Sequence, residues 1–153
     1  MQGGEDVSGA PGLRLPSYFR YYASPVKLVE VPGGGVRAWR VSIDTGGWEP
    51  ANNLIDEILF AVGGEVFPLS AADFVQEVER YRARYLTGDS PIFALYETVK
   101  AITDAERQER RYLSPHERAL VNGIRRKTFV MFEEQLRQQG DPGADPTVGQ
   151  ADS

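Results

Sequence analysis

The sequence predicts an α+β fold, with an N-terminal β-hairpin or small antiparallel sheet followed by, and packed on, about four α-helices. Strand-like patterns lie in the first third of the chain and helical spacing follows them, an order typical of α+β rather than alternating α/β folds. Signals for helix starts and ends agree with that spacing. With 153 residues, 41% of them hydrophobic and 25% charged, the chain is long enough for one globular domain.

Two runs of residues predict the hairpin. Residues 26–31 (VKLVEV) are rich in β-branched side chains, and residues 36–43 (VRAWRVSI) place Trp39, Val41 and Ile43 on one face. The glycines of the intervening PGGG segment, 32–35, permit a tight turn. The aromatic run 17–22 is a candidate short strand, and the sequence leaves open whether residues 17–23 join the hairpin as a third strand. A lone hairpin is barely stable in water, so we expect it to pack on the helices.

The helices are predicted from apolar residues at helical spacing and from capping residues. Ser70 precedes Asp73 by three residues, Ser90 precedes a proline, and Ser114 begins a Ser-Pro-x-Glu capping box. A polar extension, 104–112, has no apolar stripe and lengthens the third helix if that helix is continuous over 91–112. The predicted helical segments are 52–64, 70–88, 90–102 and 114–140.

Both ends of the chain are poor in apolar residues. Residues 1–15 are rich in Gly and Pro, and residues 140–153 carry three aspartates. Such segments bury too little apolar surface to offset their ordering entropy. We therefore expect a flexible N-terminal tail over 1–15, a single domain over 16–139 and a flexible acidic C-terminal tail over 140–153.

The composition argues against several chemistries. There is no cysteine, His116 is the only histidine, and no glycine-rich segment has the spacing of a phosphate-binding loop. We expect no catalytic residue, no cofactor and no metal. An enzyme using Asp44 and Glu49 as acid and base is an alternative that nothing in the sequence requires, and the carboxylates of Asp56 and Glu57 have the pattern of a solvated helix face.

The segment 42–53 (SIDTGGWEPANN) is the most site-like part of the chain. Its Asp, Thr, Gly and Asn residues are all typical of a turn that leads into a helix, but Trp48 is not needed for a turn. We favour Trp48 as an anchor that folds the loop onto the core, and the alternative is an exposed contact for a partner.

The remaining feature is a group of arginines. Residues 104–137 carry eight positive and six negative side chains in a chain whose net charge is −5. These numbers favour a salt-bridged surface over a phosphate-binding ridge. The candidate partner-binding residues are Trp48, Tyr21, Tyr22, Arg107, Arg110, Arg111, Arg125 and Arg126.

We therefore expect a non-catalytic module of a bacterial cytoplasmic system that binds another protein, such as an adaptor, an assembly chaperone or an antitoxin- or immunity-type inhibitor. The alternative is a nucleic-acid-binding regulator using the arginines of 107–127. No apolar run or secretory signal indicates a membrane. The sequence leaves open a homo-oligomer.

Overall fold

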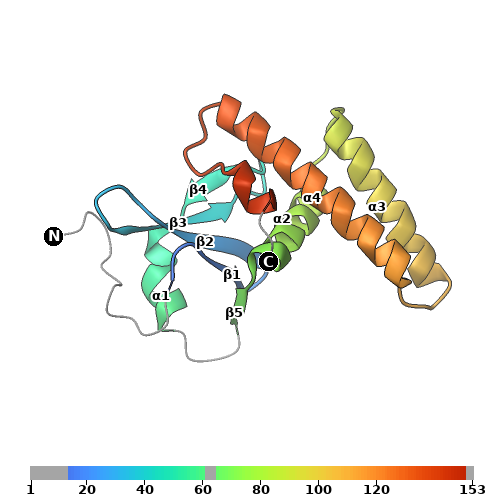
Figure 1. The fold of residues 1–153 in the computed structure, drawn as a ribbon, viewed down its shortest axis with the longest axis horizontal. Coiled ribbons are helices and arrows are strands. Elements are labelled where there is room, and N and C mark those ends of the chain that lie inside the picture. Colours follow the sequence, from blue (N-terminus) through green and yellow to red (C-terminus); the bar gives the residue numbers. More distant parts are fainter. Residues whose placement is uncertain (1–13, 61–64, 151–153) are drawn as a thin grey trace.

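The computed structural model describes residues 14–60 and 65–150 and shows a five-stranded antiparallel sheet that precedes a set of helices (Figure 1). This confirms the predicted α+β class. The strand order is β4-β3-β2-β1-β5. The strands are β1 (Ser17–Tyr21), β2 (Ser24–Glu30), β3 (Val36–Val41), β4 (Trp48–Pro50) and β5 (Val66–Leu69).

The predicted hairpin, β2 and β3, lies in the middle of the sheet. The question of a third strand is answered by β1, which pairs with β2 on one side and with β5 on the other. β4 and β5 were not predicted; they are three and four residues long and contain Pro50 and Pro68. They form the two edges of the sheet, where short strands with proline discourage pairing with another chain.

The helices agree with the predicted caps more closely than with the predicted lengths. Ser70 and Ser114 accept hydrogen bonds from the backbone N–H three residues on, and Glu117 completes the capping box. The first predicted helix is only one short turn followed by five α-helical residues, and residues 61–64 of that prediction lie outside the described residues. The helices are η1 (Asn52–Leu54), α1 (Ile55–Leu59), α2 (Ala71–Tyr85), α3 (Pro91–Gln108), α4 (Pro115–Gln138) and η2 (Pro146–Gln150).

Both faces of the sheet are covered. Alternate side chains of β2 and β3, including Val26, Leu28 and Ala38, pack against α1. Trp39 and Val41 point to the opposite face, where they join a larger core with Phe74 and other residues of α2, α4 and η2. Burial on both faces explains why the strand pattern of the hairpin departs from simple alternation of apolar and polar residues.

The C-terminal segment differs from the predicted flexible tail. Residues 141–150 fold back over the sheet, and η2 packs against α2 and α4. Gly143 approaches Trp48 so closely that an added Cβ would lie 2.4 Å from the Cβ of the tryptophan. Hydrogen bonds rather than apolar side chains hold this segment: Lys27 donates to the carbonyl of Gly143, and Asp141 accepts the backbone N–H groups of Trp48 and Gly143. The predicted N-terminal tail falls almost entirely on residues 1–13, which lie outside the described residues.

Helices α3 and α4 form an antiparallel hairpin at the end of the molecule farthest from α1 (Figure 1). α4 contacts α2 along part of its length, whereas α3 packs mainly on α4. The connection between α3 and α4, residues 109–114, forms the outer tip of this hairpin.

Candidate functional site

The tip of the α3–α4 hairpin, defined here as residues 107–120, begins where α3 ends in a Schellman motif. The N–H of Arg111 donates to the carbonyl of Glu106 at 3.1 Å, and the N–H of Arg110 donates to the carbonyl of Arg107 at 3.2 Å. This pattern needs a residue in the left-handed region, a position at which glycine is preferred. Arg110 occupies it with φ of 54°, which costs a non-glycine residue about 1–2 kcal/mol.

The end of α4 has the same motif with the usual residue. There, the N–H of Asp141 donates to the carbonyl of Leu136 and the N–H of Gly140 to that of Arg137, with φ of 85° at Gly140. The chain therefore uses glycine at one Schellman turn and arginine at the other. Backbone strain of this kind is concentrated at functional sites, so the arginine side chain is a candidate for a role in binding.

The loop after Arg110 is held by hydrogen bonds at both ends. The guanidinium of Arg111 donates to Glu109 at 2.7 Å and to both carboxylate oxygens of Glu117, at 2.7 and 3.0 Å. Glu117 also accepts the N–H of Ser114 in the capping box. The hydrogen bonds from Arg111 and from the Ser114 backbone lower the pKa of Glu117 to about 2. The loop is thus fixed before any partner arrives.

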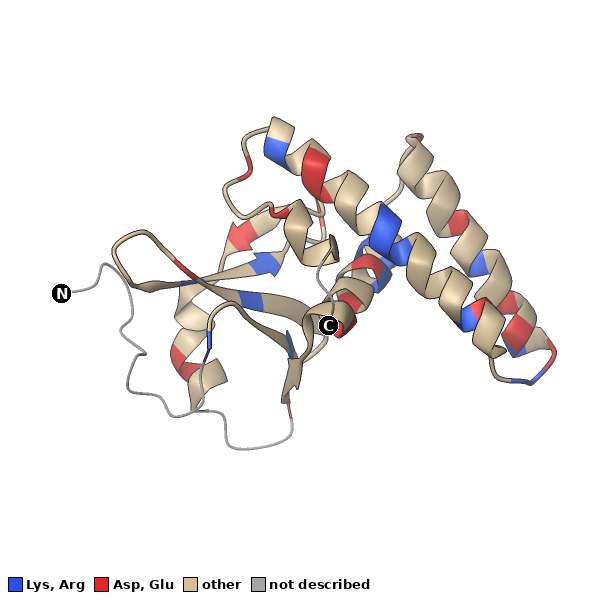
Figure 2. Ribbon diagram, viewed as in Figure 1, with Lys and Arg blue, Asp and Glu red and all other residues tan. Residues whose placement is uncertain are grey.

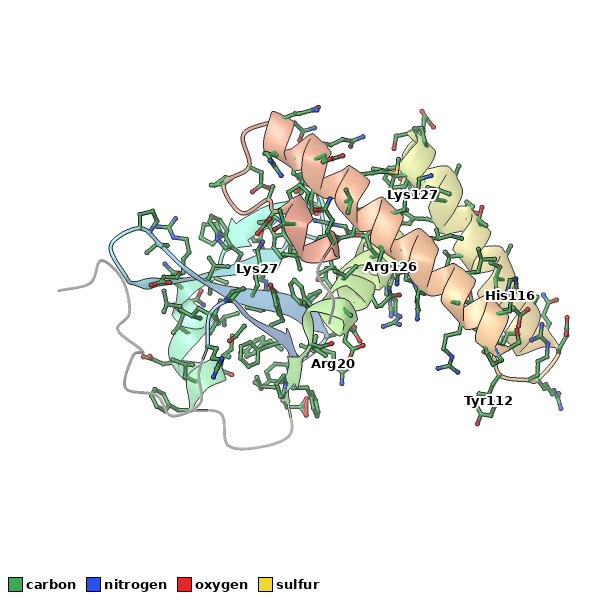
Figure 3. The ribbon with its side chains drawn as sticks, in the orientation of Figure 1. Arg20, Lys27, Tyr112, His116, Arg126 and Lys127 are labelled. Atoms are coloured by element: carbon green, nitrogen blue, oxygen red, sulfur yellow. The ribbon has the colours of Figure 1, made fainter. Side chains whose placement is uncertain are left out.

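Tyr112 is the most exposed of the large hydrophobic side chains in the described residues, with 90% of its surface accessible. It stands between Arg111 and the start of α4 and points away from the body of the protein (Figure 3). Leu120, on α4, is also exposed. The sequence-based list of candidates omitted Tyr112. The sequence does contain a signal for this residue. Tyr112 lies between a stretch without an apolar stripe and the Ser114 cap, so an aromatic residue falls in the connection between two helices.

Trp48, one of the partner-binding candidates, lies in the core of the protein. It is only 6% exposed, and its indole N–H donates to both carboxylate oxygens of Glu133, at 2.9 and 3.0 Å. The segment around it forms a turn, in which Ser42 bonds Gly46 and Gly47 through the backbone and Trp48 then enters β4. This buried position agrees with the interpretation, favoured from the sequence, that Trp48 anchors the loop to the core.

Tyr21 and Tyr22 lie at the end of β1, far from the arginines (Figure 1). The Tyr21 hydroxyl donates to Glu57 at 2.7 Å, and this hydrogen bond raises the pKa of Tyr21 to about 12. Tyr22 is 54% exposed and packs edge-on against Tyr21. These two residues do not share a surface with the hairpin tip.

The candidate arginines fall into two groups rather than one ridge. Arg107, Arg110 and Arg111 are at the tip, whereas Arg125 and Arg126 lie about 16 Å along α4 from its first residue. Arg107 borders both groups, because it lines one pocket together with Arg125. Arg125 is half-buried beside α2, and Arg126 is exposed. Positive and negative side chains alternate over the helices of the hairpin (Figure 2). The tip, residues 107–120, carries four arginines and two glutamates, and Asp104 and Glu106 in the preceding turn of α3 bring residues 104–118 to no net charge.

A buried ionic network ties the sheet to the helices and was not predicted. Arg82 is fully buried and donates to Glu79 at 2.9 Å and to Glu133 at 2.5 Å. Burial disfavours its charge, but these two carboxylates more than offset that effect and raise the pKa of Arg82. Tyr96 donates to Glu79 at 2.8 Å, and Arg82 also donates to the carbonyl of Gly46.

Lys27 adds a second buried cation to this network. It is 2% exposed, lies 4.2 Å from the centre of the Trp48 ring and donates to the carbonyl of Gly143 at 2.5 Å. Burial lowers the pKa of Lys27, and the nearby Glu133 acts against that shift. Two cations and two carboxylates balance, so the network satisfies its own charges and is best understood as a structural centre.

Groups suited to metal or acid–base chemistry are scattered. Residues 14–60 and 65–150 contain no group of three or more His, Cys, Asp or Glu side chains placed to hold a metal ion. His116 is exposed at the start of α4. Asp44 lies on the exposed turn, and Glu49 pairs with Arg40 at 3.7 Å. None of the described helices is both long and apolar enough to cross a membrane.

Comparisons with known proteins do not assign the chain to a family. No family model matches the chain, and no curated protein or solved structure matches it either.

Proposed function

We propose that this protein is a non-catalytic module that binds another protein through the tip of the α3–α4 hairpin. The observation that carries the proposal is the display of Tyr112, 90% exposed, on a loop whose backbone is already fixed. Tyrosine and arginine are enriched among the residues that dominate binding energies. A fixed loop also loses little conformational freedom on binding, which favours affinity.

Arg110 supports the same surface. Its guanidinium forms no hydrogen bond or ion pair with the residues that the structure describes, although its backbone conformation is unfavourable for arginine. A charged side chain that occupies a strained position and forms no internal hydrogen bond or ion pair is available to a partner. Tyr112, Arg110 and the exposed Leu120 then provide an aromatic, a cationic and an apolar contact.

The balance of positive and negative side chains over residues 104–118 favours a protein partner over nucleic acid. Binding to a phosphate backbone depends on an excess of positive side chains, and Arg111 is already paired with Glu109 and Glu117. We place the module in the bacterial cytoplasm, as an adaptor, an assembly chaperone or an antitoxin- or immunity-type inhibitor.

Affinity capture from the host lysate tests the proposal when variants are compared in parallel. We expect Tyr112→Ala and Arg110→Ala to lose a nuclease-resistant partner that the wild-type protein captures. Loss of a Tyr hot spot costs about 2 kcal/mol, or roughly 30-fold in affinity. Phe60→Ala is the matched control, because Phe60 is 70% exposed at the opposite end of the molecule. Equal capture by Tyr112→Ala and wild type contradicts the proposed site, and capture that nuclease abolishes favours the nucleic-acid alternative.

A further inference from the structure

A pocket of about 380 Å³ opens between α2, α3 and α4, inward from the hairpin tip. Its volume is in the range of small-molecule sites. The walls combine apolar surface from Ala83, Val99 and the ring of Tyr96 with a group of cations. These cations are Arg80 and Arg84 from α2, Lys100 and Arg107 from α3, and Arg125 from α4.

Three acidic residues, Glu79, Glu97 and Asp104, also line the pocket and neutralise only part of this group of five cations. Glu79 is buried and is already bound by Arg82 and Tyr96. Asp104 pairs with Lys100 at 2.7 Å and with Arg107 at 3.6 Å. Arg80 pairs with Glu77 at 3.1 Å. Arg84 and Arg125, in contrast, have no carboxylate within 4.0 Å among residues 14–60 and 65–150.

Arg125 is the most unusual of these cations. Its guanidinium is half-buried, and its one hydrogen bond to a described residue, to Gln76, is long at 3.4 Å. Gln76 is oriented by a hydrogen bond to the carbonyl of Asn122. Burial, and then the charge of Arg80, lower the pKa of Arg125 to about 10. A partly desolvated cation beside another cation is unfavourable unless an anion comes to lie between them.

We propose that this pocket binds the phosphate group of a phosphate monoester, with Arg125, Arg80 and Arg84 donating to its oxygens. A guanidinium is suited to two parallel hydrogen bonds with an oxyanion, and several guanidinium groups together suit a dianion better than a single carboxylate. The organic part of the ligand packs on Tyr96, Ala83 and Val99. This site does not depend on the partner proposed for the hairpin tip, because Arg125, Arg80 and Arg84 all lie outside residues 107–120.

Isothermal titration of the full-length protein with phenyl phosphate, at constant ionic strength, tests the site. We expect saturable binding to the wild type and at least tenfold weaker binding to Arg125→Gln. Arg126→Gln is the matched control, since Arg126 is the next residue but is exposed and does not line the pocket. The proposal is overturned if the wild type does not bind, if both variants lose affinity equally, or if benzoate binds as tightly as phenyl phosphate.

A second arm identifies the source of the phosphate. A short phosphoserine peptide with blocked ends replaces phenyl phosphate: tighter binding of the peptide indicates a phosphorylated protein, and tighter binding of phenyl phosphate a free metabolite. Arg125→Gln removes an unpaired cation, so we expect its thermal unfolding midpoint to be no lower than that of the wild type. If Arg125→Gln does not fold, Arg84→Gln, on the exposed rim, provides the test, and unchanged phosphate binding by that variant contradicts the proposal.

Discussion

Replacing Arg110 by glycine should stabilise the folded protein, although it removes a large side chain from the surface. Arg110 has φ of 54° at the end of α3, and its guanidinium forms no hydrogen bond or ion pair with the described residues. Gly140 occupies the equivalent position at the end of α4, with φ of 85°. The two turns therefore provide a natural pair for measuring what the left-handed backbone costs.

The magnitude follows from two opposing terms. The left-handed conformation costs a non-glycine residue about 1–2 kcal/mol. Glycine increases the conformational freedom of the unfolded chain, which costs about 0.4–1 kcal/mol. The difference predicts that Arg110→Gly raises the free energy of unfolding by about 0.5–1 kcal/mol, which corresponds to roughly 1–4 °C in Tm.

Gly140→Ala is the reverse experiment. No atom lies within 4 Å of a Cβ added at Gly140, so the substitution introduces backbone strain without a clash. We expect it to lower the free energy of unfolding by about 0.5–1 kcal/mol, from the same two terms with the sign reversed.

Urea unfolding at neutral pH, followed by tryptophan fluorescence, measures both variants. The two should shift the midpoint in opposite directions without changing the slope. If Arg110→Gly instead loses stability, the arginine has a structural role and the argument from strain is refuted. If it gains stability and binds the partner less well, the arginine trades stability for binding.

Three further predictions concern the buried network and the tip. Arg82→Met leaves the carboxylates of Glu79 and Glu133 buried without their cation, so urea unfolding should show a loss of about 3–5 kcal/mol. Glu117 has a folded pKa of about 2 against an ordinary 4.5, so the stability it contributes is present above pH 4.5 and lost as the pH falls to 2. Glu117→Gln keeps the capping box but should remove that part of the acid dependence, which melting temperatures at pH 2–5 would reveal; identical acid profiles contradict the assignment. Tyr112→Ala should change the free energy of unfolding by no more than about 0.5 kcal/mol, because the side chain is almost fully exposed.

The parts of the fold that could be predicted are those with strong local signals. The PGGG turn between two β-branched runs identified the central hairpin, and Ser70 and Ser114 marked the starts of α2 and α4. β4 and β5 could not be predicted, because strands of three or four residues with proline are stabilised by their neighbours in the sheet rather than by their own sequence. The same holds for residues 141–150, which carry few apolar side chains and are held largely by hydrogen bonds.

The candidate site was predicted less well, for a related reason. Glu79 and Arg82 are three residues apart on a helix and look like a surface ion pair, and only the fold shows that Glu133 joins them in the core. Strict alternation of apolar and polar residues along the strand would place Lys27 in solvent. In the structure, the C-terminal segment covers this side chain. The arginines around 107–111 were identified from the sequence, whereas the exposure of Tyr112 became clear only from the hairpin tip.

Site-specific photo-cross-linking tests the proposed binding surface most directly. A photoreactive phenylalanine analogue is introduced at position 112 and, as a control, at the exposed position 60, and both proteins are irradiated in living host cells. The account predicts one discrete protein adduct from position 112 that is absent from position 60 and unaffected by nuclease. Absence of an adduct at 112, or the same adducts from both positions, would contradict a partner-binding role for the α3–α4 tip.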